Sequence, residues 1–215
     1  MSERKNILFL SSSFVNIAKI FAENNPNYDV FLVIDRKFPF EIEDLDNFYP
    51  FTFNQDKVFE RNREKYFDNL AVFTNEFEPD LIITNNFSKL LPASFIDFAK
   101  FRNSKMSIIN IHHGDLTVND TDGGMAYAGL NSDIKEFLSD EEIVTTFHLI
   151  EDAQMDTGEQ LGFSHPTTLK ELKQKSLVHK KEDILNLRLR NVILSYHERT
   201  KCLNLLKKLT QELTK

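Results

Sequence analysis

An asparagine and a histidine stand two positions apart in the segment Asn110-Ile111-His112-His113. An apolar run precedes them, so the spacing predicts a buried strand that directs Asn110 and His112 to the same face. A side-chain amide beside an imidazole can polarise a carbonyl group and hold the negative charge that develops on its oxygen. The imidazole can also handle a proton near neutral pH. The pair therefore indicates chemistry at a carbonyl carbon, with a merely structural strand end as the alternative.

A carboxylate farther along the chain can orient the imidazole of His112. The candidate is Asp156, which lies in the segment Met155-Asp156-Thr157-Gly158. Asp-Thr-Gly also occurs in aspartic proteases, but those enzymes need two aspartates that share one proton, from two copies of the motif or from a symmetric dimer. We therefore disfavour an aspartic protease. A metal pair at His112 and His113 is disfavoured, because adjacent strand residues face opposite ways. We interpret His148, in the middle of another predicted strand, as structural.

Apolar runs that alternate with amphipathic stretches must position these residues. Strands are expected at residues 5–10, 29–35, 79–84 and 106–111, and helices at 14–23, 58–77 and 92–101, with an irregular connection over 36–56. This alternation predicts an α/β fold, a Rossmann-like and mostly parallel sheet with helices on both faces. Such sheets bind ligands at the carboxyl ends of their strands, which is where the asparagine and histidine lie.

The second half of the sequence no longer shows the regular alternation of strands and helices. A helix is expected over residues 125–138 and a strand over 144–150, and from residue 169 onward leucines at three-to-four spacing indicate a helical tail with one apolar stripe. We expect a catalytic domain over residues 1–163 and a helical C-terminal extension over 164–215. The stripe serves either core packing or a homodimer contact.

Composition narrows the function classes. The chain has 215 residues, a formal net charge of −7 and a pI near 5.4, which disfavours nucleic acid as a partner. The one cysteine, Cys202, rules out an internal disulfide and a four-cysteine zinc site, and we expect no metal. The apolar run at residues 7–10 is too short for a signal peptide or a membrane span, so we expect a cytoplasmic protein with no membrane partner.

Three motifs resemble those of the folate-dependent formyltransferases, and they occur in the family's order. Residues 87–92 resemble the segment that cradles the pterin ring, and residues 109–112 match the family's Asn-x-His. Residues 145–148, followed by Asp156-Thr157-Gly158, resemble its downstream strand and aspartate loop. The resemblance covers about residues 5–163.

The resemblance implies an enzyme that transfers a formyl group from 10-formyltetrahydrofolate to a primary amine of a small molecule. Asn110 and a protonated His112 would stabilise the tetrahedral oxyanion, and Asp156 would keep His112 charged and help to remove the amine proton. The pterin would be held around Phe87, Ser88, Lys89, Leu90, Leu91, Gln154, Met155 and Thr157. Acceptor contacts are expected at Ser11, Ser12, Ser13, His113, Gly123 and Gly124.

Departures from the family pattern bear on the acceptor. His113 stands where the family usually has proline, and all six glycines lie between Gly114 and Gly162, so the ribonucleotide enzyme's glycine-rich phosphate loop is missing after the first strand. We therefore favour a nucleotide-linked amino sugar or another small amine, with phosphoribosylglycinamide as the alternative. A degenerate relative that binds folate without turnover, and an unrelated nucleotide-binding module, are the rival interpretations.

Overall fold

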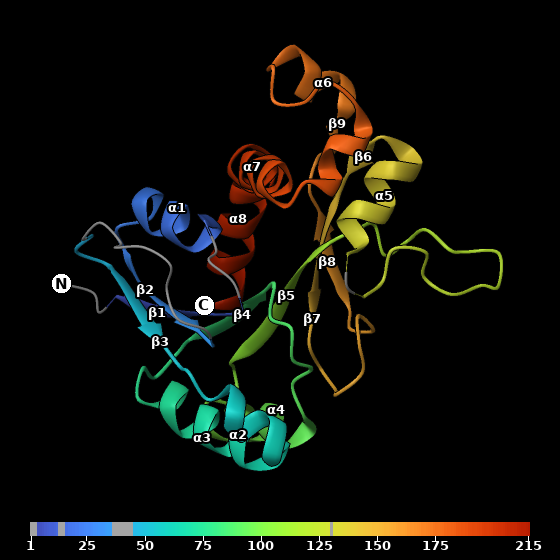
Figure 1. Cartoon of the computed structure of the whole chain (residues 1–215). Coiled ribbons are helices and arrows are strands. Elements are labelled where there is room, and N and C mark those ends of the chain that lie inside the picture. The colour runs from blue at the N-terminus through green and yellow to red at the C-terminus, as the bar shows by residue number, and fades with distance from the viewer. Residues whose placement is uncertain (1–3, 13–15, 36–44, 130) are drawn as a thin grey trace.

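A single mixed sheet forms the centre of the molecule. The computed structural model describes residues 4–12, 16–35, 45–129 and 131–215. Seven strands pair in the order β3-β2-β1-β4-β5-β7-β8, and a separate two-stranded sheet is formed by β6 and β9 (Figure 1). The strands are β1 Lys5–Ser11, β2 Tyr28–Ile34, β3 Phe48–Thr52, β4 Leu81–Asn85, β5 Ser107–His113, β6 Glu142–Ile143, β7 Thr145–Leu149, β8 Gln160–Phe163 and β9 Thr167–Thr168. The first five are parallel, and β7 and β8 are antiparallel to their neighbours.

Helices cover both faces of this sheet, which confirms the predicted fold class. The helices are α1 Asn16–Asn24, α2 Asp56–Arg61, α3 Arg63–Asn75, α4 Ala93–Arg102, α5 Ser132–Asp140, α6 Leu169–Gln174, α7 Leu187–His197 and α8 Leu203–Leu213, with a 3-10 helix η1 at Lys181–Leu185 and a π-helical turn η2 at Glu198–Cys202. In β1, Ile7 and Phe9 join the core under α1 and α8, whereas Leu8 and Leu10 join the core under α3 and α4. The strand alternates because its side-chain period is two residues.

The C-terminal helices pack against the sheet and against each other. Leu206 and Leu209 of α8 are buried in the same core as Phe9 and Phe147. A third apolar cluster joins α5, α6 and α7. The apolar side of α8 therefore covers one face of the sheet, whereas that of α7 packs against α5 and α6. No helix in the described ranges is long and apolar enough to cross a membrane.

The expected irregular connection over residues 36–56 was wrong for its second half, which contains β3. In the described part of the chain this strand stands at the end of the sheet order, beside β2, so it forms an edge of the sheet. Pro50 lies inside it, opposite Leu32. A proline lacks an N–H and is tolerated where a strand has a neighbour on one side only, and this is why the proline misled the prediction. The short strand β8 was also not expected.

Two helix predictions need correction. The helix expected over residues 58–77 is interrupted at Asn62, whose backbone is extended (φ −153°) and whose side chain accepts a hydrogen bond from Lys65 N at 3.0 Å. Asparagine is a preferred N-cap, so it ends α2 and begins α3. The helix expected over 125–138 begins only at Ser132, because residues 125–129 form turns and Asn131 has a left-handed backbone (φ 61°). The first two residues of the helix expected over 14–23 lie outside the described residues.

A buried glutamate makes the stability of the fold depend on pH. Glu136 of α5 is 2% exposed and accepts a hydrogen bond from Val144 N at 3.0 Å. Burial raises the pKa of Glu136 from 4.5 to about 8, although the backbone hydrogen bond of Val144 lowers it. Between these two pH values the folded chain holds a proton that the unfolded chain has lost, so stability falls as pH rises through this window.

Glu136→Gln should remove this dependence, because glutamine keeps the size and the acceptor but cannot ionise. At pH 8.5 we expect the free energy of unfolding to rise by on the order of 2 kcal/mol relative to the wild type, and at pH 4.5 we expect almost no difference. Denaturant titrations at both pH values measure it. The exposed Glu182→Gln is the control, and an equal effect at both pH values would contradict the assignment.

Candidate active site

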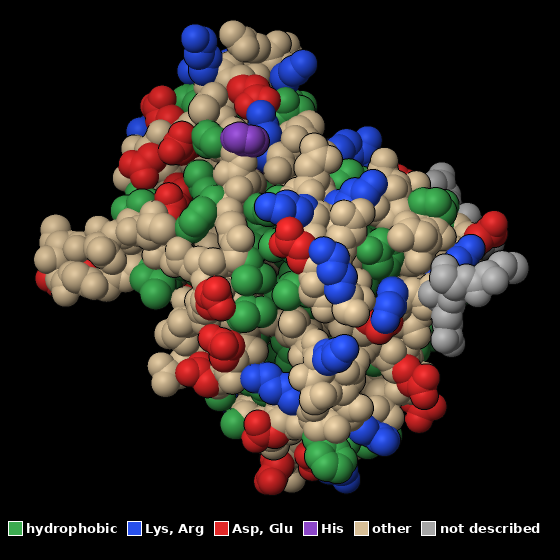
Figure 2. All heavy atoms as spheres, turned by 180° about the vertical axis from the view of Figure 1, so that it is seen from behind, with side chains coloured by type: hydrophobic (Ala, Val, Ile, Leu, Met, Phe, Trp, Pro, Cys, Tyr) green, Lys and Arg blue, Asp and Glu red, His purple; other side chains and the backbone are tan. Residues whose placement is uncertain are grey.

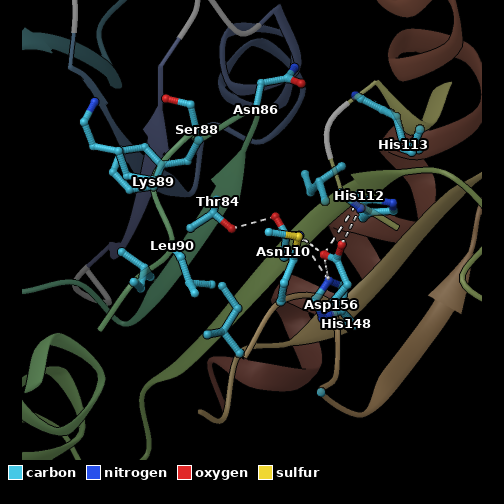
Figure 3. Close-up of a pocket in the computed structure, with 18 of the residues that line it drawn as sticks. Thr84, Asn86, Ser88, Lys89, Leu90, Asn110, His112, His113, His148 and Asp156 are labelled. Atoms are coloured by element: carbon cyan, nitrogen blue, oxygen red, sulfur yellow. Dashed lines mark hydrogen bonds and ion pairs between the residues drawn. The ribbon is translucent and has the colours of Figure 1, made fainter. Parts of the chain in front are cut away.

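A cavity of about 520 Å³ opens at the carboxyl ends of the strands. It lies next to the point where the strand order reverses between β1 and β4, the usual ligand position in open α/β sheets. Its walls come from the ends of β1, β4 and β5, from the loop after β7 and from the start of α5. The lining includes the polar residues Ser12, Thr84, Asn86, Asn110, His112, His113, His148 and Asp156 (Figure 3).

The side-chain amide of Asn110 is fixed by neighbours on both sides of β5. Thr84 of β4 donates a hydrogen bond to Asn110 Oδ1 at 2.8 Å. The amide nitrogen, Nδ2, is then directed to His148 Nε2 at 3.0 Å and to Asp156 Oδ1 at 3.4 Å. The longer contact, with Asp156, is the weaker one. The N–H that makes it can instead donate a hydrogen bond to the oxygen of an incoming ligand.

The imidazole of His112 lies between two acceptors. Its Nε2 is 2.6 Å from the backbone carbonyl of Tyr127 and therefore carries a hydrogen, while its Nδ1 faces Asp156 Oδ1 at 3.4 Å. Burial lowers the pKa of His112 below 6.5, although Asp156 and the Tyr127 carbonyl raise it. The protonated state of His112 expected from the sequence stays a prediction. A proton that reached Nδ1 would lie against the carboxylate, which favours the charged ring.

Asp156 joins the two imidazoles to the loop before α5. Its side chain is buried, and its second oxygen, Oδ2, accepts a hydrogen bond from Gly129 N at 3.0 Å. Burial raises the pKa of Asp156, but the adjacent His148 and His112 and the Gly129 amide outweigh it, so the net shift of this pKa is downward. The backbone of Asp156 is left-handed (φ 57°), a strained conformation that clusters at functional sites.

Gly158 lets the aspartate loop lie directly against β7. A Cβ at this position would be 1.7 Å from the carbonyl oxygen of Leu149. Only glycine permits so close an approach. In the Asp-Thr-Gly sequence, Gly158 is therefore required because a side chain would not fit, and Asp156 is required for its charge beside the two imidazoles.

The candidate pterin-binding residues lie mostly at the cavity. Those that line it are Phe87, Ser88, Lys89, Leu90, Leu91, Gln154 and Met155. Thr157 is not among the lining residues, and its hydroxyl donates to Asp152 at 3.3 Å. Lys89 points away from the histidines in Figure 3: its ammonium pairs with the buried Asp35 and, at 3.2 Å, with Asp56, and it lies over the ring of Tyr66.

The candidate acceptor residues divide into two groups. Ser12 and His113 line the cavity, whereas Ser11 is buried in β1 and does not line it. Gly123 and Gly124 are also absent from the lining. They lie in the segment of residues 115–129, which projects from the body of the molecule (Figure 2), in a turn where Asp120 accepts from Gly124 N at 2.8 Å. Ser13 lies outside the described residues.

The sequence analysis did not assign several of the residues that line the cavity to the site. His148 was interpreted as structural, yet it lies directly opposite Asn110 in the β5–β7 register and contacts it. Thr84 could have been suspected as a polar residue at a strand end. Arg190 forms two hydrogen bonds of 2.6 Å with Asp133, and a pair so far apart along the chain leaves no local signal.

Asp156→Asn should lower the pKa of His112 further, because the carboxylate is a group that raises it. The measurement is an NMR titration of the His112 ring resonances in the two proteins, and it needs no ligand. The exposed Asp152→Asn is the matched control. An unchanged or higher pKa of His112 in Asp156→Asn would contradict the coupling.

Comparisons with known proteins support the fold. No protein-family model and no curated protein matches the sequence. Among solved structures, phosphoribosylglycinamide formyltransferase from Bacillus halodurans has a TM-score of 0.61 and 16% identity, covering 95% of this chain and 97% of that one. Glycinamide ribonucleotide transformylase 1 from Symbiobacterium toebii has a TM-score of 0.60 and 16% identity, with coverage of 93% and 85%.

A larger protein shares the same architecture. HypX from Aquifex aeolicus has a TM-score of 0.51 and 14% identity, and the match covers 98% of this chain and 28% of that one. These identities are too low to carry an activity, but the similarity extends over almost the whole chain. The sheet order, the helical layers and the C-terminal helix together show that this chain has the fold of the folate-dependent formyltransferases.

Proposed function

We propose that this protein transfers a formyl group from 10-formyltetrahydrofolate to a primary amine of a small molecule. The observation that carries the proposal is the convergence of an oriented amide, an imidazole and a buried carboxylate, Asn110, His112 and Asp156, at one cavity. These groups suit a reaction in which charge develops on one oxygen and a proton leaves a nitrogen.

The cavity residues fit a reduced folate. The half-exposed Leu90 and the exposed Met155 offer apolar surface to a flat ring. The main chain of residues 86–91 and 154–156 borders the same space and can read the polar edge of a pterin. Ligand sites of this kind combine apolar walls with few polar groups. When bound, 10-formyltetrahydrofolate supplies the formyl carbon that the amine attacks.

Each residue of the trio then has a separate task. Asn110 donates its N–H to the formyl oxygen, because Thr84 holds the amide in that orientation. In its neutral form His112 can take the proton released by the amine at Nδ1, and Asp156 stabilises the imidazolium that results. The imidazolium also lowers the energy of the negatively charged oxygen beside it. It then gives the proton to N10 of the folate as the bond between N10 and the formyl carbon breaks, so that tetrahydrofolate leaves.

We further propose that the acceptor amine carries no phosphate in the cavity. Lys89 and Arg190, the two cationic side chains in the described lining, are already paired with carboxylates: Lys89 with Asp35 and Asp56, Arg190 with Asp133. A phosphate would gain little from cations that are already neutralised. An amino sugar or another small polar amine fits this better than the nucleotide-linked amino sugar favoured from the sequence, whose phosphates would have to lie outside the cavity. Phosphoribosylglycinamide, after which the similar solved structures are named, is the alternative.

The decisive experiment incubates the protein with 10-formyltetrahydrofolate and a panel of amines. The panel holds amino sugars, their nucleotide-linked forms, simple amines and phosphoribosylglycinamide, and mass spectrometry detects a gain of one formyl group. Formylation of a phosphate-free amine supports both proposals. Formylation of phosphoribosylglycinamide alone would overturn the acceptor proposal, and binding of folate with no product on any amine would favour a non-catalytic relative.

His112→Asn should lower kcat by about 10²-fold or more while leaving the affinity for folate almost unchanged. The histidine acts on charge and protons that appear only in the transition state, so its loss falls on the catalytic rate. Steady-state rates and folate titrations measure the two effects. The exposed His165→Asn is the control. Near-normal turnover in His112→Asn would disprove this mechanism.

Leu90→Asp should weaken folate binding by about tenfold or more, because it places a charge against the pterin's apolar surface. Isothermal titration calorimetry with a non-hydrolysable folate analogue measures the Kd. Leu185→Asp, at an exposed position outside the cavity lining, should bind the analogue normally. If both variants kept the wild-type Kd, the pterin would have to bind elsewhere.

A further inference from the structure

The back of the catalytic strand carries a second polar cluster, buried between the sheet and the C-terminal helices. Because strand residues alternate, His113 points away from the face that holds His112 and Asp156, as Figure 3 shows. The other members are Asn85 of β4, Thr145 of β7, Thr167 of β9, and the adjacent residues His197 and Glu198 at the end of α7. All are less than one-tenth exposed. The proposed roles of Asn110, His112 and Asp156 do not use this cluster.

Contacts of this cluster run from Thr167 to Glu198, with a branch at His197, whose Nε2 is also 3.2 Å from Ser164 Oγ. Thr167 Oγ1 is 2.8 Å from His197 Nδ1, and His197 Nε2 is 2.8 Å from Thr145 Oγ1. Thr145 Oγ1 is also 2.8 Å from His113 Nδ1. His113 Nε2 lies 3.3 Å from Glu198 Oε1, and the same oxygen accepts a hydrogen bond from Asn85 Nδ2 at 3.0 Å.

The carboxylate of Glu198, the last group in this series of contacts, indicates which atoms carry the hydrogens. Glu198 can only accept. Its contact with His113 Nε2 is electrostatic and is not aligned as a hydrogen bond, but it favours a hydrogen on that nitrogen, and His113 Nδ1 then accepts from the Thr145 hydroxyl. In the same order Thr145 and Ser164 share the hydrogen of His197 Nε2, and His197 Nδ1 accepts from Thr167. Burial lowers the pKa of His197 to about 3, so that ring is neutral, as this order requires. In the reverse order, His113 Nε2 would carry no hydrogen and would face the Glu198 carboxylate, unless one more proton were bound between them.

Glu198 reaches two strand ends at once. Its partner Asn85 follows Thr84, which orients the Asn110 amide, and its partner His113 follows His112. Glu198 begins the π-helical turn η2, and such turns are frequent at functional sites. A carboxylate that is 4% exposed would be unfavourable without these partners. The C-terminal helices therefore contact the back of the same strand ends that carry the site on the front.

We propose that Glu198 and Thr145 are positioning residues, which hold the ends of β4 and β5 in the geometry that Asn110 and His112 need, through a one-directional chain from Thr167 to Glu198. The catalytic part of this inference rests on the proposed formyl transfer, whereas the order of the hydrogens does not. Reacting groups displaced by about 1 Å can lose about 10²-fold in rate, so a support behind the strand ends matters to the chemistry.

The first test needs no substrate. Two-bond proton–nitrogen NMR spectra of the imidazole rings at pH 7 should show His113 and His197 protonated at Nε2 and bare at Nδ1. Thr145→Val keeps the shape but removes the hydroxyl, so the Nδ1 signal of His113 should shift. A hydrogen on Nδ1 of either ring, or a His113 signal unchanged in Thr145→Val, would overturn the chain.

The second test measures turnover with an amine confirmed as acceptor. Thr145→Val and Glu198→Ala should each lower kcat by about tenfold with the folate Kd almost unchanged, and the double variant should lose little more than either single one. Glu198→Gln keeps an acceptor oxygen and should restore most of the rate. Thr210→Val is the control, because this buried hydroxyl of α8 bonds only Leu206 O within its own helix.

The outcomes separate the claims. A normal kcat in both Thr145→Val and Glu198→Ala, or an equal loss in Thr210→Val, would overturn the positioning role even if the NMR order held. A matching loss of kcat in Glu198→Gln would also overturn it. If no amine is formylated, the proposed function fails with the catalytic half of this inference, and the NMR result still decides the chain.

Discussion

The arrangement of the candidate site depends on β5, a strand that lies inside the sheet with a neighbouring strand on each side. β5 lies between parallel β4 and antiparallel β7, and Ile109, Asn110 and Ile111 are paired with both. Strand alternation then gives its carboxyl end two faces. Asn110 and His112 point into the cavity, while Ile111 and His113 point to the C-terminal helices. Neither set can move without the other, because they share one backbone.

Antiparallel β7 has a specific consequence for this arrangement. β7 begins at the cavity edge and runs away from it, and its register places His148 directly across from Asn110. The loop that follows β7 returns along the same strands and delivers Asp156 to both imidazoles. Gly158 makes this return possible, since any side chain there would collide with Leu149. The reversal of direction thus brings the carboxylate to the amide and the imidazole.

The sequence predicted what short-range pattern controls. Apolar runs located four of the parallel strands, and the types and spacing of Asn110 and His112 singled out the strand end that borders the cavity. Register is not visible in one sequence, so His148 was interpreted as structural although it contacts Asn110. Edge strand β3 was missed because Pro50 is compatible with an edge but resembles a loop residue. The pairing of Arg190 with Asp133 depends on the tertiary fold and could not be predicted.

The glycine-free first half limits what the end of β1 can bind. A residue with a Cβ keeps its backbone farther from a ligand than glycine does. At Ser12 the hydroxyl is already used within the protein: it donates to Asp35 at 2.9 Å and accepts from Ser88 N at 2.8 Å. Asp35 is almost fully buried and paired with Lys89, so the end of β2 also turns its charge inward. Among the described residues, Ser12 and Asp35 thus stabilise the loop of residues 86–91, and the amide and imidazole oriented toward the cavity belong to β5. This distribution favours recognition by the β5 side of the cavity, where the oriented amide and the imidazole lie.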